Sequence, residues 1–338
     1  MKVSQLGEFG LIARLAALIE RRSNRKTAAW NDLVIGIGDD AAAWNCRPGN
    51  ALITTDVLVE NVHFDFSYTG WRDLGWKSIA INVSDIYAMG GTPQYALISL
   101  ALPGTHSVAD VLEMYEGMIQ ICNRYGVALA GGNVSSSEKV TVNVTLTGIA
   151  GKNMLTRSAA RPGDLIGVFG YPGLSAAALK ALQSKIAISE NAMKAFGKAH
   201  LHPSPRLDSG PALAACGVKA AIDTSDGLLS DLGHICEASA SGAVLYEQNL
   251  PVHPLLKKYF KNDYLDLVLA GGEDYELLFT AREDVMQGVI DSMPSPPAVI
   301  GEITGDKQAG ITVLDSHGQP IKLKYKGWDH YKSPVKHG

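Results

Sequence analysis

Short β-rich segments alternate with helical segments along the whole chain, and this alternation restricts the possible folds more than any other feature. In the first half we expect strands at 33–37, 51–55, 94–102, 127–131 and 140–149, and helices at 73–89 and 107–125. A second series begins near residue 152, with strands at 165–170, 219–223 and 275–281, and helices at 174–184 and up to residue 239. The pattern predicts two α/β domains that meet near Gly151. The length of 338 residues agrees with two domains.

Composition and charge exclude several classes of function. Hydrophobic residues make up 46% of the chain and charged residues 19%, which is enough apolar material for two buried cores. The net charge is −4 and no long basic run occurs, so nucleic acid is not expected as a partner. No apolar run reaches the roughly 18 residues that span a bilayer, so no membrane partner is expected either.

The N-terminus and the cysteines favour a soluble, cytoplasmic protein. Apolar residues with helical spacing, interrupted by charges, predict an amphipathic helix at 11–19 rather than a signal peptide. The four cysteines show no CxxC spacing: Cys46, Cys122, Cys216 and Cys236. They therefore indicate a reducing compartment and small buried side chains, rather than a zinc site or a redox pair.

Acidic residues recur in five short motifs that lie at loops or beside strands and helices. The motifs are Gly36-Ile37-Gly38-Asp39-Asp40, Thr54-Thr55-Asp56, Asn82-Val83-Ser84-Asp85, Asp223-Thr224-Ser225-Asp226 and Gly271-Gly272-Glu273-Asp274. Mg²⁺ prefers carboxylate and water oxygens and commonly takes one or two carboxylates together with substrate phosphates. Carboxylates that gather without a cation raise one another's pKa, because like charges repel. The five motifs together therefore favour a Mg²⁺-dependent phosphotransferase.

Each motif also has a structural interpretation. Gly38-Asp39-Asp40 alone is typical of a solvated turn, and Gly271-Gly272-Glu273-Asp274 alone is typical of a turn before a strand. Asp56 could cap the element that follows its strand, and Asp223 and Ser225 could be helix N-caps. Asp85 differs, because it lies in a largely apolar helical stripe where an unpaired carboxylate costs free energy. A metal or functional role is favoured for Asp85 over a structural ion pair.

Four further residues are candidates for ligand contacts, each with a structural alternative. Asn133, after two glycines that close a short strand, could orient a metal-bound water or simply lie in a left-handed turn. His63 suits proton transfer, although a lone histidine is more often structural. Arg157 could bind phosphate bidentately or form an interdomain ion pair. Trp328 could stack on an aromatic ligand or fill a core.

Several known phosphate and catalytic motifs are absent from the sequence. There is no GxxxxGK[ST], so a standard P-loop is excluded. Neither the HRD and DFG set of protein kinases nor a GxSxG elbow occurs, and no GxGxxG opens a helix after a strand. Phosphate binding would therefore rely largely on metal ions held by carboxylates.

The order of the motifs resembles a known family. The segments that carry the likeness are GEFGLIARL, GIGDDAA, TTD with NVHF, NVSDIYAMGG, LTRSAARPGD, IDTSDGLLSDLGHI, GGEDYELLF and KGWDHY. Together they resemble the thiamine-monophosphate kinase family, within the superfamily typified by aminoimidazole ribonucleotide synthetase. The resemblance extends over residues 7–331, and its most specific parts are IDTSDGLLSDLGHI and GGEDYELLF.

The resemblance implies a fold, an activity and partners. The fold would be α/β of the α+β type, with an N-terminal mixed-sheet domain at 1–151 that binds ATP and Mg²⁺ and pairs in a homodimer. A C-terminal α/β domain at 152–338 would complete the ATP and substrate site. The implied reaction is ATP-dependent phosphorylation of thiamine phosphate to thiamine diphosphate, by direct transfer of the γ-phosphoryl group.

The resemblance also implies roles for individual residues. The Mg²⁺ ligands would be Asp40, Thr54, Thr55, Asp56, Asp85, Asp223 and Asp226. Contacts to ATP would come from Gly132, Asn133, Arg157 and Ser225, and contacts to thiamine phosphate from His63, Glu273 and Trp328. Asp85, Asp226 and Arg157 would be catalytic. Asn133 departs from the family, in which many members carry Asp, so it would contribute an oxygen but no charge to its metal site.

Two other functions remain as alternatives. One is another ATP-using enzyme of the superfamily, such as a purine-precursor synthetase or a selenophosphate synthetase. The C-terminal motifs favour the thiamine assignment, and no cysteine precedes Cys46 as a selenophosphate synthetase would usually require. The other is a non-catalytic regulator that binds nucleotide or thiamine phosphate.

Overall fold

The computed structural model describes residues 1–37, 41–184 and 186–321, and the chain divides into two compact units. The first unit contains Met1–Ile86 and Gly91–Gly151, and the second contains Tyr87–Gly90 and Lys152–Gly338. The chain thus passes from one unit to the next after Gly151, and the short segment Tyr87–Gly90 groups with the second unit. Within the described residues, no helix has the length and apolar character needed to cross a membrane.

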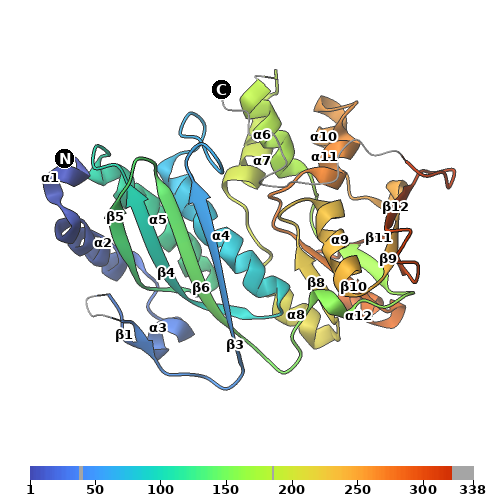
Figure 1. The fold of residues 1–338 in the computed structure, drawn as a ribbon, viewed down its shortest axis with the longest axis horizontal. Helices are drawn as coiled ribbons and strands as arrows, with labels where there is room; N and C mark the ends of the chain where they lie inside the picture. Colours follow the sequence, from blue (N-terminus) through green and yellow to red (C-terminus); the bar gives the residue numbers. More distant parts are fainter. Residues whose placement is uncertain (38–40, 185, 322–338) are drawn as a thin grey trace. The chain divides into compact units, whose positions relative to one another are not determined.

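The first unit is built around a four-stranded sheet in the order β3-β6-β4-β5 (Figure 1). Its helices are α1 Val3–Leu6, α2 Glu8–Arg22, α3 Ala28–Asp32, α4 Trp71–Ala88 and α5 Val108–Tyr125. Its strands are β1 Leu33–Ile35, β2 Ala43–Trp44, β3 Asn50–Val59, β4 Thr92–Leu102, β5 Ala128–Ser136 and β6 Thr141–Ala150. β4 pairs with β5 in parallel, whereas β6 pairs with β3 and β4 antiparallel. The mixed sheet is the one expected from the resemblance.

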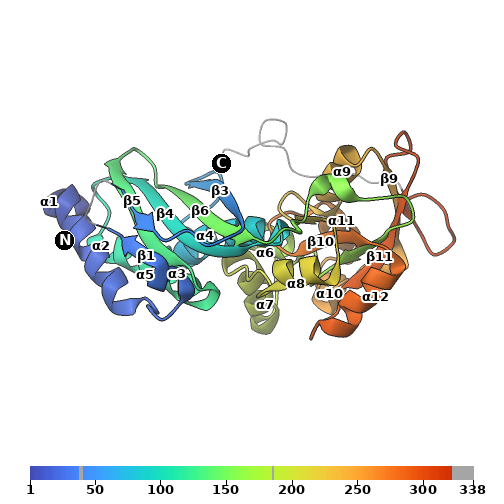
Figure 2. The same cartoon turned by 90° about the horizontal axis from the view of Figure 1, so that it is seen from below.

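One face of this sheet is covered by helices and the other is open (Figures 1 and 2). On β6 the side chains of Val142, Val144 and Leu146 are buried, and they alternate with partly exposed polar residues. This alternation follows from the two-residue period of a strand with one covered face. Helix α4 lies on the covered face, where Ile86 is close to Gly148 of β6.

Two glycines allow α4 and α5 to pack with their backbones in close contact. A Cβ at Gly75 of α4 would lie 1.9 Å from the carbonyl oxygen of Met114, and a Cβ at Gly117 of α5 would lie 2.1 Å from that of Arg72. Such distances are far below van der Waals contact, so only glycine fits at this crossing. The crossing fixes α4 against the core, and α4 carries Asp85.

The second unit contains a six-stranded sheet in the order β12-β9-β11-β7-β10-β8. Its strands are β7 Leu165–Val168, β8 Ala220–Asp223, β9 Gly242–Tyr246, β10 Leu277–Ala281, β11 Ala298–Thr304 and β12 Ile311–Leu314. Its helices are α6 Leu174–Ser184, α7 Glu190–Leu201, α8 Ser209–Cys216, α9 Leu228–Ala238, α10 Pro254–Tyr259, α11 Tyr264–Ala270 and α12 Glu283–Ser292, with short 3₁₀ turns η1 Arg157–Ala159 and η2 Glu247–Asn249. The pairs are antiparallel except for β9 with β12.

The core of this unit lies between the sheet and a helical layer that includes α6, α7, α9 and α11. Leu278 of β10 and Ile222 of β8 are buried there, together with Leu232 of α9 and Phe196 of α7. The opposite face of the sheet is covered near Gly167, where a Cβ would lie 3.0 Å from the side chain of Met286 on α12. Both faces are therefore packed, which agrees with the continuous apolar character of β7 and β10.

Two sequence expectations are wrong in detail. The segment Gly131-Gly132-Asn133 does not close its strand, because β5 continues to Ser136 and pairs with β4 over its whole length. Asn133 is therefore in an extended strand and not in a left-handed turn; the cross-strand pairing overrides the turn preference of the glycines. The cysteines also differ from one another: Cys122 and Cys236 are buried as expected, but Cys46 is exposed.

We predict that Gly75→Ala destabilises the protein, because its methyl group would collide with the backbone of α5. Overpacking of this kind costs about 1–3 kcal/mol, or more where only backbone could move. Thermal unfolding followed by circular dichroism should show a lower midpoint. The matched control is Gly197→Ala in α7, where a Cβ meets nothing within 4 Å. A midpoint for Gly75→Ala at or above that of the wild type would contradict the close crossing.

Candidate functional site

Three of the predicted metal ligands come together in the first unit. Thr54 and Asp56 are two residues apart on β3, so their side chains point to the same face of the sheet. That face is covered by α4, and the Thr54 hydroxyl donates to Asp85 Oδ2 at 2.5 Å. Asp56 and Asp85 also share a side-chain hydrogen bond. The structure therefore gathers side-chain oxygens from β3 and α4, and Thr54 and Asp85 are 31 residues apart in sequence.

The Asp85 carboxyl group perturbs the ionisation of Asp56. Burial, followed by the negative charge and the hydrogen bond of Asp85, raises the pKa of Asp56 from its ordinary value to about 7. Removing water and adding a like charge both favour the neutral acid. A divalent cation would reverse this preference, because it would be attracted by both ionised carboxylates.

Thr55 and Asn133 point to the other face of the sheet. The Thr55 hydroxyl donates to Val144 O at 3.1 Å and lies 3.2 Å from the Asn143 amide nitrogen. Asn143 pairs with Ser99, and Ser99 pairs with Asn133, so these residues form one row on the open face. The side chains of Thr55 and Asn133 are thus not gathered with Asp56 and Asp85, and their roles as metal ligands stay predictions.

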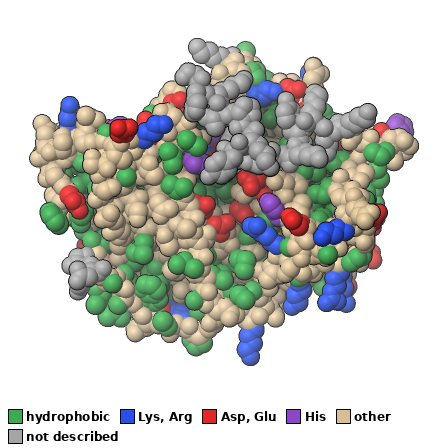
Figure 3. Space-filling model, in the orientation of Figure 1, with side chains coloured by type: hydrophobic (Ala, Val, Ile, Leu, Met, Phe, Trp, Pro, Cys, Tyr) green, Lys and Arg blue, Asp and Glu red, His purple; other side chains and the backbone are tan. Residues whose placement is uncertain are grey.

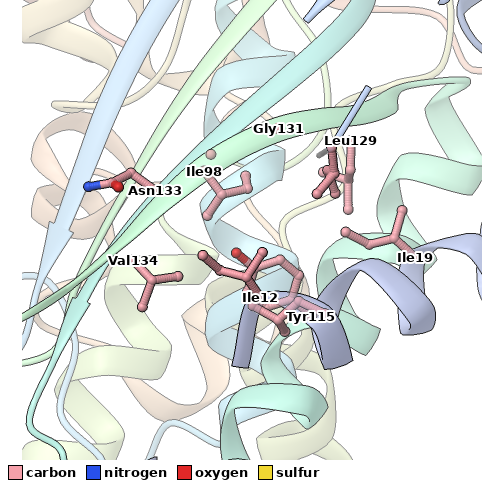
Figure 4. Close-up of a pocket in the computed structure, with 11 residues that line it drawn as sticks. Ile12, Ile19, Ile98, Tyr115, Leu129, Gly131, Asn133 and Val134 are labelled. Carbon is pink, nitrogen blue, oxygen red and sulfur yellow. The ribbon is translucent and has the colours of Figure 1, made fainter. Parts of the chain in front are cut away.

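A largely apolar pocket lies beside Gly132 in the same unit (Figure 4). Its lining residues are Ile12, Leu15, Ile19, Ile37, Ile98, Tyr115, Leu129, Gly131, Gly132, Asn133 and Val134. Figure 4 shows the amide of Asn133 pointing away from the apolar side chains of Ile12 and Tyr115. The sequence pointed to the glycines of this pocket but missed the helical residues, because α2 and α5 meet β5 only in the folded unit.

In the second unit, two acidic motifs lie on neighbouring loops. Strand β8 ends at Asp223 and pairs with the start of β10, where Leu277 is opposite Asp223. The pairing continues beyond the strands, since the N–H of Glu273 donates to Ser225 O at 2.8 Å and that of Tyr275 to Thr224 O at 2.9 Å. The structure therefore brings the Asp223-Thr224-Ser225-Asp226 motif alongside the Gly271-Gly272-Glu273-Asp274 motif.

A buried aspartate that the sequence analysis missed fixes the first of these loops. Asp231 Oδ2 accepts from the backbone N–H groups of Asp226 at 3.2 Å and Gly227 at 3.0 Å. Burial and, to a smaller extent, the charges of Asp223 and Asp226 raise the pKa of Asp231 to about 8, although the two backbone hydrogen bonds oppose this rise. The N-cap of α9 is Gly227, so the expectation that Asp223 or Ser225 caps this helix is wrong. The residues between Asp223 and Gly227 instead form a loop that is held by hydrogen bonds to Asp231 of α9 and to the Glu273 segment.

Asp226, Asp231 and His234 offer ligand atoms within 4.8 Å of one another. Asp226 was predicted as a metal ligand, whereas the other two were not. His234 is one turn of α9 beyond Asp231, which places both side chains on one helix face. The i, i+3 spacing of Asp231 and His234, just after the Asp226 motif, was the signal that could have identified them.

The remaining predicted residues occupy different surroundings. His63 Nδ1 accepts from the N–H of Val59 at 3.1 Å, so the proton of the neutral imidazole is on Nε2. The side chain of Arg157 is exposed at η1, and its backbone oxygen accepts from Ser239 Oγ at 2.9 Å. Asp40 and Trp328 lie outside the described residues.

Comparisons with known proteins identify relatives over nearly the whole chain. The family model described as AIR synthase related protein, N-terminal domain, matches residues 38–150, and the corresponding C-terminal domain matches residues 161–314. The thiamine-monophosphate kinase of Escherichia coli (strain K12) is 38% identical over 339 residues, with 97% of this chain and 99% of the relative covered.

Solved structures agree with these relatives. Thiamine-monophosphate kinase from Stenotrophomonas maltophilia K279a has a TM-score of 0.79 and 33% identity, over 92% of this chain and 96% of that one. A structure described as AaThiL complexed with AMPPCP and TMP has a TM-score of 0.75 and 34% identity, over 98% of this chain and 99% of the other. The likeness includes both units and is not restricted to one domain.

We predict that Asp56→Asn stabilises the metal-free protein in a pH-dependent way. Between about pH 4 and 7 the folded wild type keeps a proton on Asp56 that the unfolded chain has released, so wild-type stability falls as pH rises through this window. Asn cannot ionise, so its unfolding midpoint relative to wild type should rise from pH 4 to 7 and level off above. Thermal unfolding in EDTA at each pH measures this difference. Asp110→Asn, in the first turn of α5, is the matched control, and a pH-independent difference for Asp56→Asn would contradict the coupled pair.

Proposed function

Because the chain belongs to the thiamine-monophosphate kinases among the AIR synthase related proteins, we propose that it transfers the γ-phosphoryl group of ATP directly to thiamine phosphate. The products would be ADP and thiamine diphosphate. The carboxyl pair of Asp56 and Asp85, with the Thr54 hydroxyl between strand and helix, is the observation that carries this proposal. The solved structure of a relative complexed with AMPPCP and TMP supports the proposal that ATP and thiamine phosphate are the two ligands.

Mg²⁺ is the cofactor that best fits the donor set. Carboxylate and hydroxyl oxygens are its usual ligands, and Asp56, Asp85 and Thr54 supply them in the first unit, as Asp223 and Asp226 do in the second. Bound Mg²⁺ would neutralise phosphate charge during the transfer. Several ions fit the number of carboxylates better than one, and Asp40 and Asn133 are further proposed ligands.

The acceptor explains why the proposed site is rich in metal ligands and poor in general bases. Thiamine phosphate already carries a phosphate monoester oxygen that is nucleophilic near neutral pH. The protein must bring two anionic phosphates together in line, which requires positioning and charge compensation rather than proton abstraction. Arg157 is the proposed cationic side chain, and Ser225 the proposed hydroxyl contact to ATP.

The apolar pocket at Gly132 is the proposed place for the flat, apolar part of ATP. Ile12, Leu129 and Tyr115 offer contact surface for a ring, and Gly132 lets the chain approach closely without a side chain. A Cβ at Gly132 would lie 2.1 Å from Ile98 O, so no other residue fits there. His63, Glu273 and Trp328 stay proposed contacts to thiamine phosphate, and a cytoplasmic location stays a prediction.

We also propose that the open face of the first-unit sheet pairs with a second copy of the chain. Ile53 and Val57 of β3 are 74% and 42% exposed, and Leu97 of β4 is 38% exposed. Figure 3 shows hydrophobic side chains spread among polar ones over this surface. Ile53, Val57 and Leu97 lie on this one face of the sheet, and exposed apolar side chains on a shared face are suited to contact with another chain.

The decisive test of the reaction is a turnover assay with ATP and thiamine phosphate, with and without Mg²⁺. We expect ADP and thiamine diphosphate in equal amounts, only when Mg²⁺ is present. Asp85→Ala should lower turnover by at least about 10²-fold with little loss of fold, because it removes a charge that acts on the reacting phosphates. Glu283→Ala, an exposed acid on α12, is the control and should retain activity.

The outcomes of this assay separate the alternatives. Activity with a purine precursor or selenide, but not with thiamine phosphate, would support another enzyme of the superfamily. Stoichiometric binding of both ligands without ADP release would support a regulator. Near-normal activity of Asp85→Ala would mean that the proposed carboxylate cluster is wrong.

The dimer proposal predicts that charge on the open face separates the copies. Ile53→Asp and Val57→Asp together should convert a dimer to a monomer in light scattering, because they place unpaired charges in an apolar contact. Leu207→Asp, which changes an exposed apolar residue of the second unit, should leave the dimer intact. A wild-type monomer, or a dimer that survives the double change, would rule out this face.

A further inference from the structure

We infer that His200 is a positioning residue for the acceptor site: held by Ser175, its imidazole orients the carboxylate of Glu273 toward thiamine phosphate. The inference rests on the proposed function, because it takes Glu273 as a contact to that substrate. It adds two residues of the second unit, from α6 and α7, that no sequence motif indicated.

The geometry centres on one ring nitrogen. His200 Nδ1 lies 2.9 Å from Ser175 Oγ and 3.5 Å from Glu273 Oε2. The histidine is only 2% exposed, whereas the Glu273 side chain is 27% exposed. The buried His200 ring therefore contacts the carboxylate of Glu273, a side chain that is partly exposed to solvent. This arrangement is expected where a buried residue orients a side chain that binds a ligand.

The backbone on both sides of this contact is rigidly held. Glu273 and Tyr275 both have positive φ, 66° and 53°, a conformation that costs free energy for residues other than glycine. Their N–H groups donate to Ser225 O and Thr224 O, so the neighbouring loop maintains this conformation. The Glu273 backbone is thus fixed, and its long side chain retains the rotational freedom that a support would restrict.

The same loop also fixes the residue that holds the imidazole. The Asp274 carboxylate accepts from the N–H groups of Gly173 at 2.6 Å and Ser175 at 3.1 Å, at the start of α6. Ser175 and Glu273 are therefore tied to one another through Asp274 as well as through His200. The imidazole completes a closed set of contacts in which each member restricts the next.

Electrostatics explain why Glu273 needs such a support. Burial and, to a smaller extent, the nearby charges of Glu276 and Glu273 raise the pKa of Asp274 to about 8, although its backbone hydrogen bonds oppose this rise. Glu273 thus lies beside Asp274, and each carboxylate repels the other when both are ionised. One N–H at His200 Nδ1, shared between Ser175 Oγ at 2.9 Å and Glu273 Oε2 at 3.5 Å, would hold that carboxylate in one direction as an anion.

The expected ligand chemistry follows from the substrate. Thiamine phosphate carries a permanently cationic thiazolium ring and an aminopyrimidine, both of which favour a nearby carboxylate. A Glu273 side chain held in place would bind this part of the substrate with less loss of conformational freedom. His200 should therefore affect binding of the acceptor and leave ATP binding unchanged.

The test compares two substitutions at His200 in the full-length protein with Mg²⁺. His200→Phe keeps a ring but cannot hydrogen bond, and it should raise KM and Kd for thiamine phosphate about 10-fold, with KM for ATP changed less than about twofold. His200→Asn places an amide near the position of Nδ1 and should restore much of the affinity. His317→Phe, in an exposed turn, is the matched control, and thermal unfolding checks that each variant is folded.

A double-mutant cycle with Glu273→Gln separates positioning from general damage. If His200 acts through Glu273, then His200→Phe should weaken thiamine phosphate binding little further in the Glu273→Gln background. Additive losses, or equal losses for ATP and thiamine phosphate, would overturn the inference. Failure of the proposed function would look different, because the wild type itself would then neither bind nor phosphorylate thiamine phosphate.

Discussion

Carboxyl groups held close together and out of water are the constraint on which both units depend. Asp56 faces Asp85 in the first unit, and Asp231 lies near Asp223 and Asp226 in the second. Burial and like charge raise the pKa of Asp56 to about 7 and that of Asp231 to about 8, so the charged form is disfavoured in both units. Holding these carboxyl groups together therefore costs free energy, and protons or bound cations reduce that cost. Such a cost is typical of a functional site rather than of residues that stabilise the fold.

The surrounding elements are arranged so that this cost does not distort the site. In the first unit, the glycine crossing of α4 and α5 and the burial of α4 place Asp85 opposite β3. In the second, backbone hydrogen bonds join the two acidic loops, and a Cβ at Gly272 would lie 2.5 Å from Ser225 O. Rigid backbone contacts hold the segments that carry the charged side chains. Packing therefore resists the repulsion between these side chains, and they do not move apart.

The sequence predicted those features that depend on local periodicity. The helix α4, the alternation along β6 and the apolar β10 follow from local spacing, but α4 is buried on nearly every side and not along one stripe only, since Lys77, Ser78 and Asn82 are buried too. Periodicity did not predict which face of the sheet is covered, or the register in which the strands pair. Thr54 and Thr55 are adjacent in sequence, yet only Thr54 contacts Asp85, because strand geometry sends neighbours to opposite faces and pairing decides which face is covered.

Residues that support others were the hardest to find from sequence. Asp231 and His200 carry no motif of their own, and His200 is 73 positions before the glutamate that it contacts. Their importance appears only when the loops are seen together, because each acts through a hydrogen bond to another site residue. Ligand-contacting residues tend to lie in glycine-rich loops that are visible in a sequence, whereas their supports lie on ordinary helices, where a buried histidine or aspartate differs from a core residue only by its partners.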